Sequence, residues 1–410
     1  MTFRILVFAA LLLVPGGSFA KPLPDIPGFE PNLTIYLAKG PANACGQGCD
    51  HWIAIEGKVD PGAAARVARF LRGIQDTRLP IYLHSPGGAV EPSYVIGRLL
   101  RSRKAIARIG RTVVKGCGAD AQVDDACLRI KTAGGEVEAE IDTRHSMCNS
   151  ACSYLFLGAA TREVAPDAAV AVHNSKFTFL VHGHPSAGQI AAFTDKSMAR
   201  ADRERASYIA AMGINRELDA LISTVKFENL HILTRPELYR FGVDGREFVE
   251  TAWTTESAVR SHLRKVAFQK KADGSFRAME WRLTCENKER ARLMFVREFD
   301  KDGAGKNSVA VMAGTGKPVA LGTSPARIGA FEGWSGILSS DVMKTMLNVQ
   351  HLQMAEATLL PGGKIDTRIF DIDTTGLEPA WTQLLPACPA APARVKPLPA
   401  SPAVVPAPAK

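Results

Sequence analysis

Three short segments of this 410-residue sequence hold residues that could act together on a carbonyl group. The first is Ser85-Pro-Gly-Gly88, expected at a turn between a strand and a helix. Glycines at such a turn let backbone N–H groups approach a substrate with no Cβ in the way. Gly87 and Gly88 are therefore candidates for one side of an oxyanion hole. The same four residues also make an ordinary turn, and the segment alone does not choose between these roles.

The second segment is Met147-Cys-Asn-Ser-Ala-Cys152, which leads into an apolar run ending at Gly158. This pattern predicts a helix with Ser150 at or near its N-terminus. The Ser150 hydroxyl would then lie at the positive end of the helix dipole, and the Ala151 N–H would become a second oxyanion donor. The alternative is that Ser150 only caps the helix, which is the commonest role of a serine in that position.

The third segment is Arg162-x10-His173, in which His173 ends an apolar strand predicted over residues 168–172. A hydroxyl nucleophile needs a base within hydrogen-bond reach, and histidine is the side chain suited to that task near neutral pH. A lone histidine at a strand end is more often structural. Its interpretation as a base therefore depends on its combination with Ser150.

Alternating elements are expected to position these segments. Residues 33–264 alternate short β-rich runs with helical stretches, which predicts βαβ units and a largely parallel sheet. A helix is predicted over 61–75, and two helices broken at Gly213 are predicted over 197–225. The polar, cysteine-bearing segment 116–146 is interpreted as a surface insertion or hairpin.

The first twenty residues have the pattern of a signal peptide. Arg4 precedes an apolar run over 5–14, and small residues lead to an expected cleavage site near Ala20. The apolar run is short for a membrane span, so no stable span is expected after cleavage. An uncleaved anchor is the alternative. The prediction is therefore export to the periplasm or beyond.

The remaining parts of the chain differ in composition. Residues 21–32 are Pro-rich and predict an extended lead-in. Residues 265–388 show alternating strands separated by turn-like segments, which predicts a smaller β-rich domain. Residues 389–410 consist largely of Pro, Ala and Val and predict a disordered tail.

Eight cysteines in an exported chain favour disulfides over free thiols. Along the sequence they fall as Cys45/Cys49, Cys117/Cys127, Cys148/Cys152 and Cys285/Cys388. Spacing does not fix the connectivity. Cys285 and Cys388 are nevertheless expected to bond, because they bracket the β-rich region and are its only cysteines. No C-x2-C or H-x3-H spacing accompanies them, so neither a metal nor a cofactor is expected.

The net charge of +9 is spread along the chain and is accompanied by no nucleic-acid-binding motif, so nucleic acid is not an expected partner.

Together these motifs resemble the proteolytic subunit of the Clp protease (ClpP) and its crotonase-like relatives, and more closely the exported ClpP-like proteins of bacteria. The matching features are Cys45-x3-Cys49, Ser85-Pro-Gly-Gly88, Cys148-x-Ser-Ala-Cys152, Arg162, His173 and a closing Leu233-Thr-Arg-Pro-Glu segment that ends at Asp244. The resemblance covers roughly residues 50–245. It implies a ClpP/crotonase-like α/β fold with a repeated ββα core, followed by the β-rich domain.

The resemblance also assigns roles to residues. It implies Ser150 as nucleophile and His173 as general base, with Gly87, Gly88 and Ala151 framing the oxyanion hole. The chain departs from the pattern at the aspartate that completes the family's triad, because Leu230 stands in its place.

Three residues are candidates to orient His173 in place of that aspartate. Glu228 and Asn229 are the nearest in sequence, and Asp219 is a weaker candidate. Lys176 is a rival base, because related folds use a Ser–Lys dyad. Cys152 is a rival nucleophile, but a structural disulfide is its expected role.

The leading hypothesis is an ATP-independent exported serine peptidase that acts on peptides or unfolded envelope proteins. The main alternative is a catalytically inactive ClpP-fold binding or scaffold protein, favoured by the missing aspartate. An acyl-CoA enzyme ranks third, because acyl-CoA is not expected outside the cytoplasm. The β-rich region resembles small envelope domains of the invasion-associated locus B type, for which a binding role is expected. Assembly into a homo-oligomer is left open.

Overall fold

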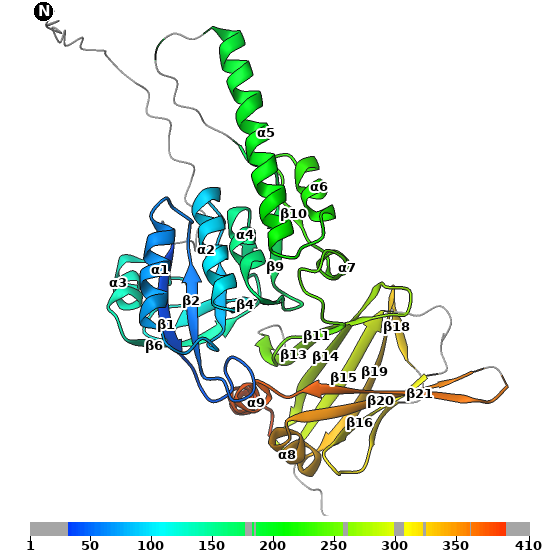
Figure 1. Ribbon diagram of the computed structural model, residues 1–410. Coiled ribbons are helices and arrows are strands. Elements are labelled where there is room, and N and C mark those ends of the chain that lie inside the picture. The colour runs from blue at the N-terminus through cyan, green and yellow to red at the C-terminus, as the bar shows by residue number, and fades with distance from the viewer. Residues whose placement is uncertain are drawn as a thin grey trace, which may run out of the picture.

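The computed structural model describes most of the chain in several stretches: residues 32–176, 183, 186–256, 261–298, 307–322, 325–360 and 362–390. The expected signal peptide, all but the last residue of the lead-in and the tail beyond 390 lie outside the described residues. The described chain is a mixed α/β protein with several sheets (Figure 1). No helix in the described stretches is long and apolar enough to cross a membrane.

A seven-stranded sheet forms the centre of the N-terminal part, with the strand order β5-β6-β1-β2-β3-β4-β8. Its strands are β1 (Thr34–Lys39), β2 (His51–Glu56), β3 (Ile81–His84), β4 (Ile106–Ile109), β5 (Arg111–Val114), β6 (Glu136–Asp142) and β8 (Thr161–Glu163). The run β2-β3-β4-β8 is parallel. Two pairs, β1 with β2 and β5 with β6, are antiparallel.

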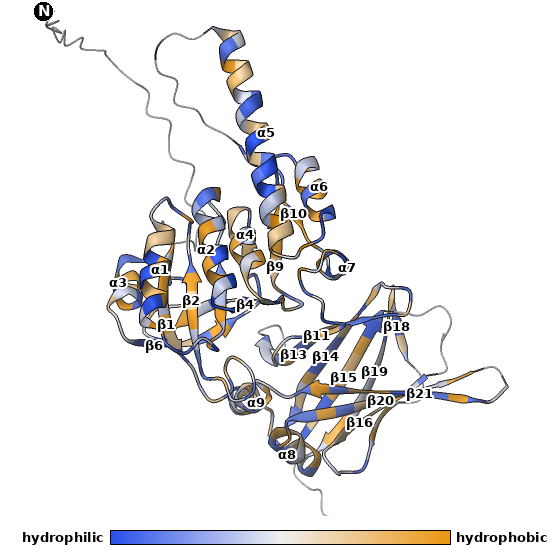
Figure 2. Ribbon diagram, in the orientation of Figure 1, coloured by the Kyte–Doolittle hydropathy of each residue, from blue (hydrophilic) through white to orange (hydrophobic). Residues whose placement is uncertain are grey.

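The two faces of this sheet carry separate apolar clusters, because successive side chains of a strand point to opposite faces. Ile53 and Ile55 of β2 join the cluster under α1 (Ala63–Gly73), α2 (Val90–Ser102) and α4 (Ala151–Gly158). Trp52 and Ala54 of the same strand join the cluster on the opposite face, with Cys127 of α3 (Asp125–Thr132). Figure 2 shows the hydrophobic colouring of β2 between these layers.

Helices α2 and α4 approach closely at a pair of glycines. A Cβ added to Gly158 would lie 2.3 Å from the Cα of Gly97, so neither position has room for a side chain. The helix bearing Ser150 at its start is thereby packed tightly against α2. On the same side, the Tyr208 hydroxyl donates to the Tyr154 carbonyl at 2.7 Å.

A second, three-stranded sheet has the order β10-β9-β7 and carries the predicted site. Its strands are β7 (Met147–Asn149), β9 (Ala169–Val172) and β10 (His231–Ile232). Between β9 and β10 the chain forms α5 (Ala187–Ala211), which projects from the body in Figure 1, and α6 (Glu217–Thr224). The short helix α7 (Arg235–Arg240) follows β10.

The segment 116–146 was expected to be a surface insertion or a hairpin, and the antiparallel pairing of β6 with β5 agrees with the hairpin. It supplies α3, closed by the Cys117–Cys127 disulfide, and β6. Strand β6 lies inside the main sheet, between β1 and β5. The segment is therefore part of the sheet.

Two further sheets form the C-terminal part, with the orders β11-β13-β14-β15-β19-β18 and β17-β16-β20-β21. The strands are β11 (Phe248–Glu250), β12 (Thr254–Glu256), β13 (His262–Lys270), β14 (Phe276–Asn287), β15 (Arg290–Glu298), β16 (Asn307–Ala313), β17 (Val319–Gly322), β18 (Ala326–Ile328), β19 (Phe331–Ser339), β20 (His351–Leu359) and β21 (Ile365–Asp373). The helices are α8 (Ser340–Asn348) and α9 (Leu377–Leu384). The core of this part includes Trp281, Phe295 and Trp334, and a disulfide joins Cys285 to Cys388.

Candidate active site

Ser150 occupies the turn between β7 and α4 in an unusual backbone conformation. Its φ of 55° and ψ of −123° lie where side-chain-bearing residues are rarely found. Such conformations cluster at functional sites, and a serine on a sharp strand-to-helix turn is how hydrolases present a nucleophile. The Ser150 hydroxyl makes no capping hydrogen bond to α4. The alternative role of a simple N-cap is therefore not realised.

The Ser85-to-Gly88 turn lies directly against Ser150. The Ser85 N–H donates to the Met147 carbonyl at 2.8 Å, and the Asn149 N–H donates to the Ser85 carbonyl at 3.0 Å. A Cβ added to Gly87 would lie 2.7 Å from the Ser150 Cβ and 3.0 Å from the Ala151 nitrogen. The φ of 100° at Gly87 also favours glycine. Only glycine fits this position without moving the serine turn.

The three predicted oxyanion-hole residues have different roles. The Gly87 N–H donates to the Ser85 Oγ at 3.1 Å and is not available to a substrate. Ala151 begins α4, so its N–H has no acceptor within the helix. Among the described residues, neither the Ala151 N–H nor the Gly88 N–H has a hydrogen-bond acceptor. Gly88 and Ala151 are thus the candidate donors, and Gly87 provides the space beside them.

His173 directly follows β9, the strand that is bonded to Ser150. The Ser150 N–H donates to the Ala171 carbonyl at 2.8 Å, and His173 directly follows the end of β9 at Val172. The imidazole is half-buried, with its centroid 4.8 Å from that of the Phe227 ring. Ser150 Oγ and His173 form no hydrogen bond with each other in the described part of the chain. Such bonds are often long before substrate binds.

The surroundings of His173 favour its neutral form. Burial lowers the pKa of the imidazole, while the backbone of Phe227 and the charge of Glu228 act in the opposite direction. The Nδ1 atom is buried and has no hydrogen-bond partner among the described residues. A neutral imidazole can accept the proton of a hydroxyl, and Nδ1 is the position at which an orienting group would bind.

The orienter candidates differ in what they contact. Glu228 is exposed, and its charge reaches His173. Asn229 is exposed, and its N–H donates to the Lys226 carbonyl at 3.0 Å. Asp219 accepts a hydrogen bond of 2.6 Å from Arg205 Nε, which engages its carboxylate elsewhere. Glu228 is the candidate that the electrostatics favour.

The two rival residues have other surroundings. Cys152 is bonded to Cys148 and therefore carries no thiol that could attack a substrate. Lys176 is exposed, and its Nζ lies 5.6 Å from the centroid of the Phe227 ring. The Lys176 ammonium therefore makes a cation–π contact with the Phe227 ring. Among the described residues, no hydrogen bond joins Lys176 to Ser150.

Arg162 has a structural role that the motif alone did not reveal. Its guanidinium donates to the carbonyls of Leu157 and Ala159 at the end of α4, and to that of Val243 at 2.9 Å. It fixes the C-terminal end of the helix whose first turn carries the site. The signal in the sequence was a basic residue shortly after an apolar helix, where cations favour the last carbonyls.

A separate cavity of about 330 Å³ lies away from Ser150. Its wall includes charged residues from both parts of the chain: Arg108, Glu163, Arg246, Glu250, Lys265 and Asp373. Arg108 pairs with Glu163 at 2.7 Å, and Lys265 pairs with Glu250 at 3.1 Å. Sequence reasoning did not find this cavity, because its wall comes from residues far apart in the chain.

Fold and site together define a mixed α/β protein with four disulfides and a serine on a nucleophile-type turn. No family model matches the chain, and no curated protein matches it. Solved structures that are similar to parts of the chain include the following two. Invasion-associated protein B from Bartonella henselae is 11% identical, with a TM-score of 0.26 over 33% of this chain and 92% of that one. A serine-to-alanine mutant of 1510-N, a membrane-bound stomatin-specific protease, is 14% identical, with a TM-score of 0.27 over 46% of this chain and 73% of that one. At these values neither structure assigns a family, and what the site can do follows from its own residues.

Proposed function

We propose that the chain is an exported, ClpP/crotonase-like serine peptidase in which Ser150 is the nucleophile. The observation that carries the proposal is the backbone of Ser150, held at a φ of 55° although its hydroxyl caps nothing. Residues in such conformations cost about 1–3 kcal/mol each. A purely structural turn would have no reason to retain a serine there, whereas a nucleophile needs its hydroxyl exposed on that turn.

The proposed reaction is acyl transfer. Ser150 Oγ attacks the peptide carbonyl carbon while His173 takes the hydroxyl proton, and the N–H groups of Gly88 and Ala151 bind the oxyanion. His173 then protonates the leaving amine as the C–N bond breaks, which leaves an ester on Ser150. Water, deprotonated by His173, hydrolyses the ester and restores the serine. No nucleotide is required for these steps.

Exposed apolar side chains near His173 support a peptide or unfolded envelope protein as substrate. Phe227, Leu230 and Ile232 expose 43%, 50% and 60% of their surfaces on one short stretch of chain. Apolar groups gathered on a surface are typical of binding sites for apolar segments. The four disulfides support a location outside the cytoplasm, where such bonds persist.

One observation favours the second candidate, an inactive binding or scaffold protein of the cell envelope. His173 Nδ1 is buried and has no hydrogen-bond partner within the described stretches, and the exposed Leu230 stands where the family pattern has an aspartate. A histidine that lacks its orienting carboxylate can lose about 10⁴-fold in rate. A protein with a binding role alone would have the same fold without catalytic turnover.

Labelling with a serine-directed fluorophosphonate tests the proposal on the folded, secreted protein. We expect labelling of Ser150, none in Ser150→Ala, and a steep fall in His173→Ala because the hydroxyl loses its base. Lys176→Ala should label like wild type. If wild type resists the reagent and cleaves no peptide of a broad library, the scaffold function is correct. Labelling that is lost in Lys176→Ala would instead assign the base to that lysine.

A pair of glycine variants tests whether the space that Gly87 leaves beside the serine turn matters for the reactivity of Ser150. In Gly87→Ala the new methyl group would collide with Ser150 and the Ala151 nitrogen, so labelling should fall by roughly 10²-fold or more. Gly73→Ala is the control, because Gly73 ends α1 with open space around its Cα. That control should label normally, and equal labelling of both variants would remove Gly87 from the site.

A further inference from the structure

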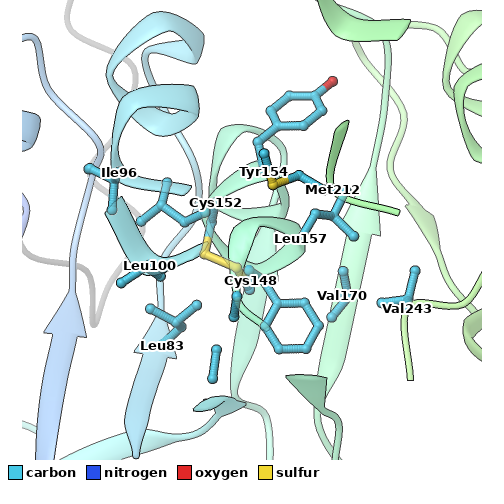
Figure 3. Close-up of a cluster of buried hydrophobic side chains, with 14 of the residues drawn as sticks. Leu83, Ile96, Leu100, Cys148, Cys152, Tyr154, Leu157, Val170, Met212 and Val243 are labelled. Carbon is cyan, nitrogen blue, oxygen red and sulfur yellow. A yellow bond between two sulfur atoms is a disulfide. The ribbon is translucent and has the colours of Figure 1, made fainter. Parts of the chain in front are cut away.

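The Cys148–Cys152 disulfide encloses the candidate nucleophile. It joins the residue two before Ser150 to the residue two after it, and so links β7 to the first turn of α4. The two Cα atoms are 5.1 Å apart, and both residues are completely buried. Figure 3 shows the bond among the apolar side chains of Leu83, Ile96, Leu100 and Leu157.

Hydrogen bonds also restrain the turn inside this bond, through the pairing of β7 with β9 and through Ser85. Strand β7 has three residues, and Ser150 adds no side-chain cap to α4. The Ser150 N–H donates to the Ala171 carbonyl, and the Ser150 carbonyl accepts hydrogen bonds from the Ser153 N–H at 3.0 Å and from the Ser153 hydroxyl at 2.6 Å. An unfavourable conformation persists only when its surroundings over-determine it. A covalent bond across the turn adds to these restraints and, unlike a hydrogen bond, does not open while the protein is folded.

We infer that the Cys148–Cys152 disulfide is a positioning element for Ser150. It fixes the end of β7 relative to the start of α4, so that Ser150 Oγ and the Ala151 N–H keep their places beside Gly88. The inference rests on the proposed function and gives Cys152 a part in the chemistry, whereas the sequence assigned it a structural role alone. The two cysteines touch no substrate and act through the serine turn.

The chain contains a matched control for this bond. Cys45–Cys49 closes a loop of the same length, with the same Cα separation of 5.1 Å, but it joins no element of the serine turn. In the chain-entropy account, equal loop lengths give equal stabilisation. A difference between the two bonds in the reactivity of Ser150 therefore reports position and not loop closure.

The first test compares two double variants by fluorophosphonate labelling, well below their melting temperatures. In C148A with C152A we expect the labelling rate of Ser150 to fall by roughly 10- to 100-fold, because small displacements of a reacting group carry such penalties. In C45A with C49A the rate should stay within about twofold of wild type, since the serine turn is unchanged. Equal rates in the two double variants would overturn the inference.

Hydrogen exchange gives a second readout that needs no activity. Amides of residues 147–158 should exchange faster in C148A with C152A, while those of α1 should not change. Wild-type exchange over 147–158, or an equal increase in α1, would overturn the inference. If wild-type protein is never labelled, the proposed function fails and the exchange result still decides the role of the bond. Should the double alanine variant not fold, C148V with C152A restores part of the lost core volume and is measured in its place.

Discussion

At the scale of single residues, the site combines groups with opposing requirements. Glycine would adopt the Ser150 backbone more readily, but it has no hydroxyl to offer. Burial disfavours the charged form of His173, whereas the negative charge of Glu228 favours it. In the proposed reaction His173 would be neutral at rest and charged after taking the hydroxyl proton, so both influences bear on its role as a base.

The pKa of His173 predicts the pH dependence of the reaction. Burial lowers the pKa below its ordinary 6.5, and the base is active only when neutral. Labelling of Ser150 should therefore be constant near neutral pH and fall with a midpoint below pH 6.5. Glu228→Gln removes a negative charge that raises this pKa, so the midpoint should move to still lower pH. The measurement is a pH profile of the labelling rate, with Asn229→Ala as the control that keeps the wild-type midpoint. If Glu228→Gln leaves the midpoint unchanged, the charge of Glu228 does not influence the pKa of His173.

Residue types in the sequence were enough to select the candidate residues, but not to assign a role to each of them. Ser150 and His173 stand out in the sequence because a hydroxyl before an apolar helix and a histidine after an apolar strand form a recognisable set. The separate roles of Gly87 and Gly88 could not be predicted, because the direction of an N–H depends on φ and ψ values that glycine leaves open. The hydrogen bond from the Gly87 N–H to Ser85 Oγ engages Gly87 and leaves the Gly88 N–H as the candidate oxyanion donor.

At the scale of elements, the segment that follows α7 is bonded to the elements that position the candidate site. Asp244 accepts hydrogen bonds from the Val164 N–H and from Arg246, and its carboxylate pairs with the buried Arg235 at 2.9 Å. Arg162 links the same segment to the end of α4. Burial raises the pKa of Asp244, but the bonds to Arg246, Arg235 and Val164 outweigh it and lower the pKa to about 2.

This carboxylate predicts an acid-sensitive contribution to stability. Because the folded pKa of about 2 lies below the ordinary 3.8, the contribution is complete above pH 3.8 and is lost as the pH falls through 2. Its size is about 2 kcal/mol. Asp244→Asn should cost about 3–5 kcal/mol at pH 7, because it leaves Arg235 buried without its counter-charge. Urea unfolding of both proteins at several pH values should show the gap narrowing towards acid.

The matched control for Asp244 is Asp76→Asn, which removes an exposed carboxylate beside Arg78. Exposed pairs contribute little, so this variant should unfold like wild type across the same pH range. A gap between wild type and Asp244→Asn that stays constant with pH would show that the carboxylate is not held in its charged form.

A helix with a clear apolar period was predictable, and a strand rich in charged residues was not. The helix expected over 61–75 forms as α1, because its buried residues Ala63, Val67 and Leu71 repeat at helical spacing. Strand β6 was missed because three glutamates alternate with its buried residues Val137 and Ala139. The alternation of charged and apolar residues is the signal of a half-buried strand, and the polar composition of the segment obscured it.

At the scale of the whole molecule, the chain holds separate cores before and after about residue 248. The N-terminal part has two cores, one on each face of the seven-stranded sheet, and a third core lies between the C-terminal sheets. The second part begins earlier than the expected residue 265, because β11 and β12 already pair with β13. Strands of three residues carry too little alternation to be predicted from sequence.

The Cys285–Cys388 disulfide predicts a difference in stability between these parts. It closes a loop with a separation of 103 residues, whereas Cys117–Cys127 has a separation of 10. In the chain-entropy account, removing the longer bond by C285A with C388A should cost about 4–5 kcal/mol, and removing the shorter one by C117A with C127A about 3 kcal/mol. The loss from the longer bond should be confined to the C-terminal part, because both of its cysteines belong to that core.

The positions of the tryptophans allow the two parts to be followed separately. Trp253, Trp281, Trp334 and Trp381 lie in the C-terminal core, and Trp52 lies in the N-terminal part. C285A with C388A should therefore lower the urea midpoint measured by tryptophan fluorescence and leave the labelling of Ser150 in dilute urea unchanged. C117A with C127A should do the reverse, because its bond closes the segment that holds α3 against the N-terminal sheet. If both double variants shift the two midpoints equally, the chain unfolds as one cooperative unit and its two parts do not have separate stabilities.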